Sequence, residues 1–426
     1  MLTKSLGLRE QYQRFGNVQN LMVRVDSNAL LAEHEKQEYG KAKGVDGEDK
    51  SSYGLEAHKN VVDLERRLKD MKYRPQPVRR TYIPKLNGKL RPLGIPAYED
   101  RLVQGAMARI LNTIYESIFL DCSYGFRPNR GCHDAIAQIN NAIMFKPVNW
   151  VLEADIRGFF DHVSHKWMRA FLEHVIKDKR FLRYVMRFLK AVIMEQGKKI
   201  PSEEGTPQGG LISPILANIY LHYVLDLWIT YMVIPSLRGY AEYVRYADDF
   251  VILFQNEDDA KQVLQLLKER LAKFSLELAE EKTRVFPFGL RKKEKEEFDF
   301  LGFTINIVKT LKGNLRVGLR TCQKKLKATM QATKRWITEH MHDETEDMLK
   351  NLNLKYRGHC NYYAVNGNFV ALAKLRQFLM WTTFRILRRR SEVRKIPWEK
   401  FLPLWEKFIY RPRITVDIWH WQTRKT

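Results

Sequence analysis

Two adjacent aspartates between two apolar runs constrain the fold of this chain more than any other feature. Segment 243–254 reads Tyr-Val-Arg-Tyr-Ala-Asp-Asp-Phe-Val-Ile-Leu-Phe, so β-type runs flank Ala247, Asp248 and Asp249. This pattern predicts a hairpin whose tip carries two carboxylates. Because Asp is also common in turns for backbone reasons, the pair by itself indicates only a turn.

A third carboxylate ends a second predicted strand, where the run 151–154 is followed by Asp155. If this strand lies beside the hairpin, three acids meet at one end of a sheet, and they repel one another unless cations neutralise them. Mg²⁺ prefers carboxylate oxygens and substrate phosphates. Two such ions, ~3.5–4 Å apart, can activate a hydroxyl and stabilise the leaving oxygen in phosphoryl transfer. The three acids therefore favour the metal site of a nucleotide polymerase.

The charge balance indicates a polyanionic partner. The chain has 426 residues, enough for two or three domains, with 73 Lys/Arg against 49 Asp/Glu and a net charge of +24. Its 45% hydrophobic content is typical of a folded protein, not of a disordered basic tail. Residues 306–426 hold 26 Lys/Arg against 9 Asp/Glu, interleaved with aromatics. This favours nucleic-acid contact, and solvated helical faces over core tryptophans are the alternative.

Hydrophobic periodicity predicts a mixed α/β region followed by a helical one, with a composition shift near 305–325. We expect strands at 151–154, 243–245, 250–254 and 300–305, and helical periods at 165–194, 258–276, 323–340 and 371–390. Segment 291–297 reads as an exposed loop or hairpin tip. The four cysteines are too few for a secreted disulfide scaffold. The most lipid-like stretch, 211–235, carries Asp226, so we expect a buried helix there and no membrane span.

Asp155 together with Tyr246-Ala247-Asp248-Asp249 resembles the catalytic core of reverse transcriptases. Further blocks resemble, in family order, those of bacterial group II intron reverse transcriptase/maturases over about residues 44–365. They are Tyr82-Ile83-Pro84-Lys85 to Arg91-Pro92-Leu93-Gly94-Ile95-Pro96, Tyr124-Gly125-Phe126-Arg127-Pro128, Gly205-Thr206-Pro207-Gln208-Gly209-Gly210 to Ala217-Asn218, Glu281-Lys282-Thr283, Phe300-Leu301-Gly302-Phe303, and Tyr356-Arg357-Gly358 with Asn361-Tyr362-Tyr363. Because no Cys/His-rich endonuclease segment is recognised, we expect an endonuclease-lacking form or a group II-like relative.

The resemblance implies an α+β, right-hand polymerase with fingers, a palm with an antiparallel sheet, and an α-helical thumb. It divides the chain into an N-terminal extension and fingers (1–100), a fingers/palm reverse transcriptase core (101–305), a helical thumb or X/maturase domain (306–375), and a basic C-terminal nucleic-acid-binding region (376–426).

The resemblance also assigns the catalytic centre. Asp155, Asp248 and Asp249, with the backbone carbonyl of Ile156, are expected to hold two Mg²⁺ ions, for which Mn²⁺ can substitute. Lys282 is a candidate proton donor to the pyrophosphate leaving group; the alternative is an ordinary surface lysine.

Besides Ile156, four further residues are expected to bind the dNTP. Lys85 and Arg91 flank Asn87-Gly88, a hairpin-turn signal, and would fold both cations onto the triphosphate; a solvated basic hairpin is the alternative. Phe160 would leave no room for a 2′-hydroxyl, unless it is a core phenylalanine. Gln208 would face the incoming nucleotide.

Arg127, Tyr356, Arg357, Arg388, Arg389 and Arg390 are expected to contact nucleic acid. The expected partners are an RNA template with a DNA or RNA primer, and a structured group II intron RNA with its target DNA, in a bacterial cytoplasm. Three functional hypotheses stay open: an RNA-directed DNA polymerase, an RNA-binding maturase that holds intron RNA in its spliceable fold, and a domesticated enzyme of DNA repair or phage defence.

Overall fold

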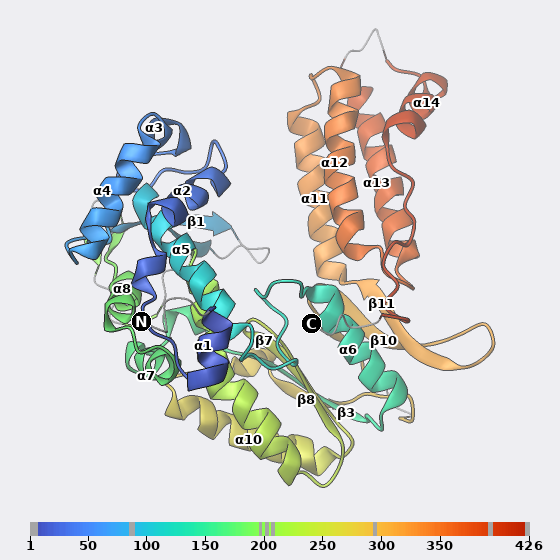
Figure 1. The fold of residues 1–426 in the computed structure, drawn as a ribbon. Coiled ribbons are helices and arrows are strands. Elements are labelled where there is room, and N and C mark those ends of the chain that lie inside the picture. The colour runs from blue at the N-terminus through green and yellow to red at the C-terminus, as the bar shows by residue number, and fades with distance from the viewer. Residues whose placement is uncertain are drawn as a thin grey trace. The chain divides into compact units, whose positions relative to one another are not determined.

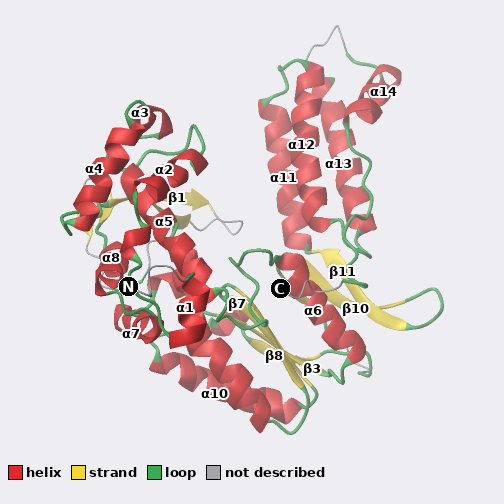
Figure 2. Cartoon of the chain, viewed as in Figure 1, coloured by secondary structure: helices red, strands yellow, loops and turns green. Residues whose placement is uncertain are grey.

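A computed structural model of the chain describes residues 7–84, 90–195, 198–200, 204–205, 209–292, 296–390 and 395–421. They form two compact units. Unit 1 comprises Met1–Gly131, Leu152–Ile252 and Asp258–Val285, and unit 2 comprises Cys132–Val151, Leu253–Glu257 and Phe286–Thr426. Within both units helices accompany small sheets (Figure 2), which is the mixed α+β class predicted from the sequence.

Unit 1 is mostly helical around one central helix. This helix, α5 (Tyr98–Tyr115), buries Leu102, Met107 and Leu111 completely and packs against its helical neighbours. The other helices are α1 (Leu8–Phe15), α2 (Ser27–Lys36), α3 (Lys50–Gly54), α4 (Ala57–Lys69), α7 (His165–Val175), α8 (Lys179–Leu189), α9 (Ser213–Leu221) and α10 (Glu257–Lys273). Short 3₁₀ or π turns are η2 (Met22–Arg24), η3 (Phe159–Asp161), η4 (His222–Asp226), η5 (Ile229–Val233), η6 (Ile234–Ser236) and η7 (Glu280–Lys282).

Two four-stranded sheets position the elements discussed below. The first has the order β2-β1-β4-β5, with β1 (Val78–Pro84) antiparallel to β2 (Leu90–Ile95), followed by β4 (Ile193–Glu195) and β5 (Lys198–Ile200). The second has the order β6-β7-β3-β8, from β6 (Ala241–Tyr246), β7 (Asp249–Phe254), β3 (Trp150–Asp155) and β8 (Arg284–Pro287). The strands predicted at 151–154, 243–245 and 250–254 are thereby confirmed.

Unit 2 combines a three-stranded sheet with a bundle of helices (Figure 1). The sheet order is β11-β10-β9, from β9 (Phe298–Phe300), β10 (Phe303–Lys309) and β11 (Leu315–Thr321). The helices are α6 (Cys132–Phe145), α11 (Gln323–Glu339), α12 (Thr345–Tyr363), α13 (Phe369–Leu387) and α14 (Trp398–Phe408), of which α11, α12 and α13 lie side by side. Apolar side chains such as Ile337, Leu352 and Trp405 are fully buried between them, because the helices carry apolar residues at helical spacing.

Two predicted elements are divided in the structure. Segment 300–305 is not one strand, because Leu301 and Gly302 have positive φ values of 49° and 80° and reverse the chain between β9 and β10. Segment 165–194 forms two helices, since Asp178 accepts bonds from Arg180 N and Phe181 N and so begins α8. The predicted domain limits after residues 305 and 375 fall inside β10 and α13. Nowhere in the described residues does a helix have the length and hydropathy needed to cross a membrane.

Candidate active site

A tight turn between β6 and β7 presents the two adjacent aspartates. Ala247 has a φ of 58°, a left-handed conformation that is uncommon for a residue other than glycine. Arg245 Nη1 donates to the Ala247 carbonyl at 2.9 Å. A Cβ on Gly125 would lie only 2.5 Å from the Ala247 nitrogen, so the loop before Pro128 can pass against the turn only with glycine at position 125.

The third aspartate ends β3 and is held beside a lysine. Ala279 N donates to the Asp155 carbonyl at 2.8 Å, and Arg157 N donates to the Glu277 carbonyl at 2.9 Å. These bonds fix the segment before η7 along the end of β3. As a result, Lys282 Nζ forms a short ion pair with Asp155 Oδ2, and this contact raises the pKa of Lys282.

The three carboxylates lie close enough to repel one another. Burial raises the pKa of Asp248, and the Asp155 charge adds to this, whereas Arg91 and Lys282 oppose it. Asp249 retains solvent contact, but the protein atoms crowded around it and the charges of Asp248 and Asp155 raise its pKa to about 7. The sequence predicted this gathering, and the structure brings the three acids together.

The chemistry of these donors fits a hard divalent cation, which three clustered carboxylates attract. Across the described residues, however, no set of three or more His, Cys, Asp or Glu side chains has the arrangement of a preformed metal site. The Lys282 ammonium instead supplies the positive charge beside Asp155. The acids are assembled, and their metal ligation stays a proposal.

The residues expected to bind the dNTP differ in exposure and in the element that carries them. Arg91 is exposed on β2, opposite Ile83 in the hairpin register, and its charge acts on Asp248. Phe159 enters the core with 1% exposure, which leaves Phe160 half-buried against it, with ring centroids 5.3 Å apart.

Ile156 is buried and pairs with Leu278. Lys85 and Gln208 lie outside the described residues. Near Gln208, a Cβ on Gly209 would lie 2.3 Å from the Gly94 carbonyl, and the φ of Gly209 is 114°. Gly209 therefore lies directly against Gly94 of β2.

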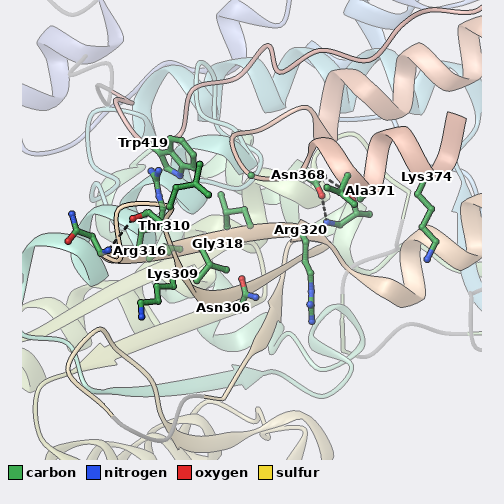
Figure 3. A pocket seen from close by; sticks show the side chains of 18 of the residues that line it. Asn306, Lys309, Thr310, Arg316, Gly318, Arg320, Asn368, Ala371, Lys374 and Trp419 are labelled. Atoms are coloured by element: carbon green, nitrogen blue, oxygen red, sulfur yellow. Dashed lines mark hydrogen bonds between the residues drawn. The ribbon is translucent and has the colours of Figure 1, made fainter. Parts of the chain in front are cut away.

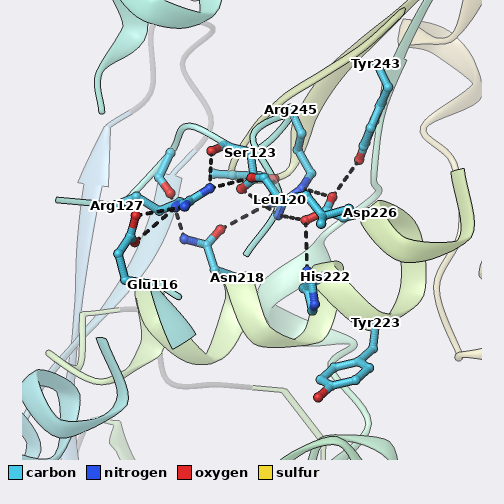
Figure 4. A network of polar contacts seen from close by, with 12 residues as sticks. Glu116, Leu120, Ser123, Arg127, Asn218, His222, Tyr223, Asp226, Tyr243 and Arg245 are labelled. Atoms are coloured by element: carbon cyan, nitrogen blue, oxygen red, sulfur yellow. Dashed lines mark hydrogen bonds and ion pairs between the residues drawn. The ribbon is translucent and has the colours of Figure 1, made fainter. Parts of the chain in front are cut away.

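A buried polar network stands behind the aspartate turn (Figure 4). Arg245 and Asp226 are completely enclosed and form a bidentate pair, with Nε–Oδ1 at 2.7 Å and Nη2–Oδ2 at 2.5 Å. The remaining guanidinium donors reach Asn218 Oδ1 at 3.1 Å, Ser123 Oγ at 2.8 Å and the Ala247 carbonyl. The guanidinium thus joins the turn to α9, to η4 and to the loop at Ser123.

Asn218 extends this network to the glycine that touches the turn, since its Nδ2 donates to the Gly125 carbonyl at 2.7 Å. Sequence analysis did not single out Arg245 or assign a partner to Asp226. A signal existed, because each is a lone charge within an apolar run, and a charge buried in such a setting needs a partner.

Three residues expected to contact nucleic acid, Arg127, Tyr356 and Arg390, form hydrogen bonds with the protein's own groups. Arg127 has a 2% exposed side chain, pairs with Glu116 at 2.8 Å and donates to the carbonyls of Leu120 and Ser123. Tyr356 is buried in the bundle of unit 2, where its hydroxyl donates to the Leu372 carbonyl at 3.1 Å.

Arg390 donates to the carbonyls of Met341 and Asp343 and to Thr345 Oγ1, so it holds the connection between α11 and α12. Arg357, Arg388 and Arg389 are exposed. Charge alone did not separate these two groups, because a buried guanidinium and a solvated one look alike in a sequence.

Comparisons with known proteins agree with this arrangement. Residues 83–305 match the family described as "Reverse transcriptase (RNA-dependent DNA polymerase)". The group II intron-encoded protein LtrA of Lactococcus lactis subsp. cremoris is 31% identical over 412 residues, covering 77% of this chain. Protein YkfC of Escherichia coli K12 is 38% identical over 238 residues, covering 49% of this chain. The chain spans 66% of the length of LtrA and 62% of that of YkfC.

Proposed function

The chain belongs to the reverse transcriptase (RNA-dependent DNA polymerase) family, and we propose that it copies an RNA template into DNA by adding dNTPs to a primer 3′-hydroxyl. The observation that carries this proposal is the meeting of Asp155, Asp248 and Asp249 at the end of the β6-β7-β3-β8 sheet, where the surrounding protein atoms and then the charges of Asp248 and Asp155 raise the pKa of Asp249. Acids held together against their own repulsion suit a site that accepts cations.

The three carboxylates and the carbonyl of Ile156 would hold two Mg²⁺ ions, or Mn²⁺ in their place. When bound, such a pair lowers the pKa of the attacking hydroxyl and stabilises the charge of the leaving pyrophosphate. The buried Arg245 network would keep the aspartate turn in the conformation that this requires. Positioning by a rigid, fully bonded network costs little reorganisation during the reaction.

Lys282 would supply a proton to the pyrophosphate. Its ammonium is protonated near neutrality, so the group has a proton to donate. Its side chain is 63% exposed, which leaves it free to turn from Asp155 toward a leaving group. Proton donation from such a position typically contributes 10²–10⁴-fold to rate.

The dNTP would be bound by charge and shape together. Arg91 and Lys85 would hold the triphosphate, and Gln208 would face the incoming nucleotide. The half-buried ring of Phe160, supported by Phe159, would close the space beneath the sugar and exclude a 2′-hydroxyl. The template and primer would contact the exposed Arg357, Arg388 and Arg389.

The relatives suggest a biological setting. LtrA is named as a group II intron-encoded protein, and we propose that this chain is likewise encoded by a group II intron and assists its splicing and mobility. A second candidate, an RNA-binding maturase, is favoured by the net basic composition of residues 306–426. A domesticated enzyme of repair or phage defence is the third, and flanking intron RNA in the genome would argue against it.

Primer extension on an RNA template with dNTPs and Mg²⁺ tests the polymerase. The double variant Asp248→Ala/Asp249→Ala should lose roughly a thousandfold or more in rate. Asp258→Ala, which removes an exposed carboxylate from α10, is the matched control and should extend normally. Extension by the double variant at the wild-type rate would overturn the assignment. Intron splicing by the double variant, with extension abolished, would assign the maturase role to the same chain.

A further inference from the structure

Helix α8 carries charged residues of one sign only. They are Lys179, Arg180, Arg183 and Arg187, and the exposed lysines Lys177 and Lys190 stand just outside its two ends. The apolar side chains of the helix, such as Phe181 and Phe188, are buried on its other side. Because helical residues three and four positions apart are neighbours on the surface, the cations form one continuous row.

The turn that follows α4 brings a further cation against this row. Arg74 Nη1 donates to the carbonyls of Met71 and Tyr73 at 2.9 and 3.3 Å, and Arg187 Nη1 donates to the same two carbonyls at 3.3 and 2.8 Å. Two guanidinium groups are therefore held side by side by shared acceptors. These bonds use only Nη1 of each group, and a guanidinium has five N–H donors, so both keep donors for another acceptor.

The like charges gathered here are not neutralised by the protein. Burial, and then the charge of Arg74, lowers the pKa of Arg187, and Arg183 adds to this. The acids of the neighbouring elements already have partners: Asp70 pairs with Lys72 at 3.7 Å, Glu65 pairs with Lys69, and Asp178 accepts from backbone N–H groups at the start of α8. Within the part of the chain that the structure describes, no acid lies within ion-pair distance of these three arginines.

We call Arg74, Lys177, Lys179, Arg180, Arg183, Arg187 and Lys190 together the basic face. Arg180 also donates to the Lys69 carbonyl, which helps to join α8 to the end of α4 (Figure 1). Such a structural contact does not account for Lys179, Arg183 and Lys190. Their side chains are exposed and have no hydrogen bond or ion pair among the described residues.

The surroundings of the basic face favour phosphates over bases or lipid chains. Its aromatic neighbours Tyr73, Tyr184 and Phe188 are buried, so these rings are not available to stack on an unpaired base. The apolar side of α8 is likewise enclosed, so the helix cannot insert into a bilayer as amphipathic surface helices do. A row of cations instead suits a double helix, which presents phosphates in close succession. Double-stranded RNA is recognised mainly through its shape and its phosphates.

A cavity in unit 2 that is also lined by cations lacks these properties (Figure 3). It has a volume of about 1040 Å³ and lies between the β10–β11 hairpin and the first turns of α11 and α13. The donors Arg316 Nε and Trp419 Nε1 at one end are enclosed by protein, and Asp417 offsets the charge of Arg316. A ligand in the cavity would not reach these donors, whereas the cations of the basic face lie at the surface.

We propose that the basic face binds the phosphate backbone of double-helical RNA, with one phosphate group held between Arg74 and Arg187. The planar fork of arginine can donate two bonds to a single phosphate. That the duplex is RNA rests on the proposed function, in which the template and the intron are RNA. The elements that carry Asp155, Asp248 and Asp249 contribute no residue to the basic face, so the two sites can be tested separately.

Lysine acetylation followed by peptide mass spectrometry tests the proposal in the full, unaltered chain. An RNA hairpin of about 20 base pairs should protect Lys177, Lys179 and Lys190 from the acetylating reagent, and high salt should abolish this protection. Lys41 and Lys59, exposed lysines that pair with glutamates, are the controls and should react equally with and without the hairpin. Equal acetylation of the three lysines while the hairpin is bound would overturn the proposal.

A matched pair of triple variants connects binding to these charges. In Lys179→Gln/Arg183→Gln/Lys190→Gln, the affinity for the hairpin, measured by fluorescence anisotropy, should fall by about tenfold or more. The slope of log K against log salt should become shallower by about 2 to 3. Lys41→Gln/Lys59→Gln/Arg320→Gln removes the same charge from exposed, ion-paired positions and should bind as the wild type does. Equal affinities of the two triple variants would overturn the proposal.

Further arms of the experiment separate other ligands and the polymerase. Tighter binding of a DNA duplex of the same sequence, lost in the first triple variant, would overturn RNA as the partner. Loss of binding to phosphatidylcholine–phosphatidylserine vesicles in that variant, with unchanged hairpin affinity, would overturn the proposal in favour of a membrane. Primer extension by the wild type is measured separately: if it fails while the hairpin protects the lysines, the polymerase assignment is wrong and the basic face stands.

Discussion

Two arginines, the buried Arg245 in unit 1 and the half-buried Arg316 in unit 2, make different contacts with the protein around them. Arg245 in unit 1 uses its guanidinium donors within the protein, on Asp226, Asn218, Ser123 and the Ala247 carbonyl. Arg316 in unit 2 lies on Trp419, and its Nε has no acceptor among the described residues. A fully bonded buried cation fixes a local shape, whereas the Arg316 guanidinium is held by its contact with the Trp419 ring.

The largest effect on stability is expected when Arg245, the arginine with all its donors bonded, is replaced. Arg245→Met should lower the free energy of unfolding by about 3–5 kcal/mol, because it leaves the Asp226 carboxylate buried without its partner. Urea denaturation followed by circular dichroism measures this loss, with Arg357→Met, an exposed arginine of α12, as the control.

The double variant Arg245→Met/Asp226→Leu sharpens the same test. It should recover much of the stability, because both buried charges are gone. It should still extend primers poorly, since no guanidinium then holds the Ala247 carbonyl. A stable single variant, or full extension by the double variant, would contradict the positioning role of the network.

Lys282 differs from both arginines, because it forms an ion pair with Asp155 and is largely exposed to solvent. Lys282→Met should slow primer extension by about a hundredfold while template–primer binding is unchanged. Single-turnover extension measures the rate. Lys282→Arg keeps the charge but cannot readily release a proton, so it should be almost as slow. A wild-type rate in Lys282→Arg would reduce the role of Lys282 to electrostatics.

His222 tests whether the buried Arg245–Asp226 network can accommodate a protonated imidazole beside it. Burial, with help from Arg245 and Arg127 and against Asp226, lowers the pKa of His222 to about 4. Between that pH and about 6.5, the unfolded chain binds a proton that the folded chain does not, so stability falls as the pH drops through this range. From pH 6.5 to 5 the loss should be about 2 kcal/mol.

The variant His222→Phe should remove that part of the pH dependence, because the ring is kept and the titration is lost. Thermal unfolding at several pH values measures it, with the exposed His58→Gln as control. An identical pH slope in His222→Phe and wild type would show that the network does not exclude the proton.

The smallest effect on stability is expected at the arginine with a spare donor. Arg316→Gln should change the free energy of unfolding by no more than about 1 kcal/mol, because no buried acid is left unpaired. The same urea denaturation measures it. A loss as large as that of Arg245→Met would remove the contrast between the two regions and make Arg316 a structural residue.

Much of unit 1 could be predicted because its signals are local. The strands around Asp155 and the Asp248–Asp249 turn follow from short apolar runs, and the structure confirms them. The Arg245–Asp226 pair could not be assigned, since its partners meet only after a π turn and a strand are placed together. The distribution of charged residues along a sequence does not show which of them are buried, and Arg127 illustrates this.

For unit 2 the sequence predicted the helices but not the turns and side-chain contacts between them. Its helices at 323–340 and 371–390 follow from periodicity, and the structure has them at Gln323–Glu339 and Phe369–Leu387. The turn at Gly302 was missed, because apolar residues continue on both sides of it. The cavity has no sequence signal, since its wall is assembled from a hairpin, two helices and a residue near position 420.

The ion pair between Lys282 and Asp155 has a practical consequence for handling the protein. If dissolved cations alone neutralised these carboxylates, a chelating buffer would leave their mutual repulsion uncompensated and would destabilise the local fold. Here the Lys282 ammonium, which is part of the chain itself, pairs with Asp155 and offsets part of this repulsion without any added ion. Chelation of divalent ions should therefore abolish the proposed primer extension without unfolding the protein, and extension should return when the ions are restored.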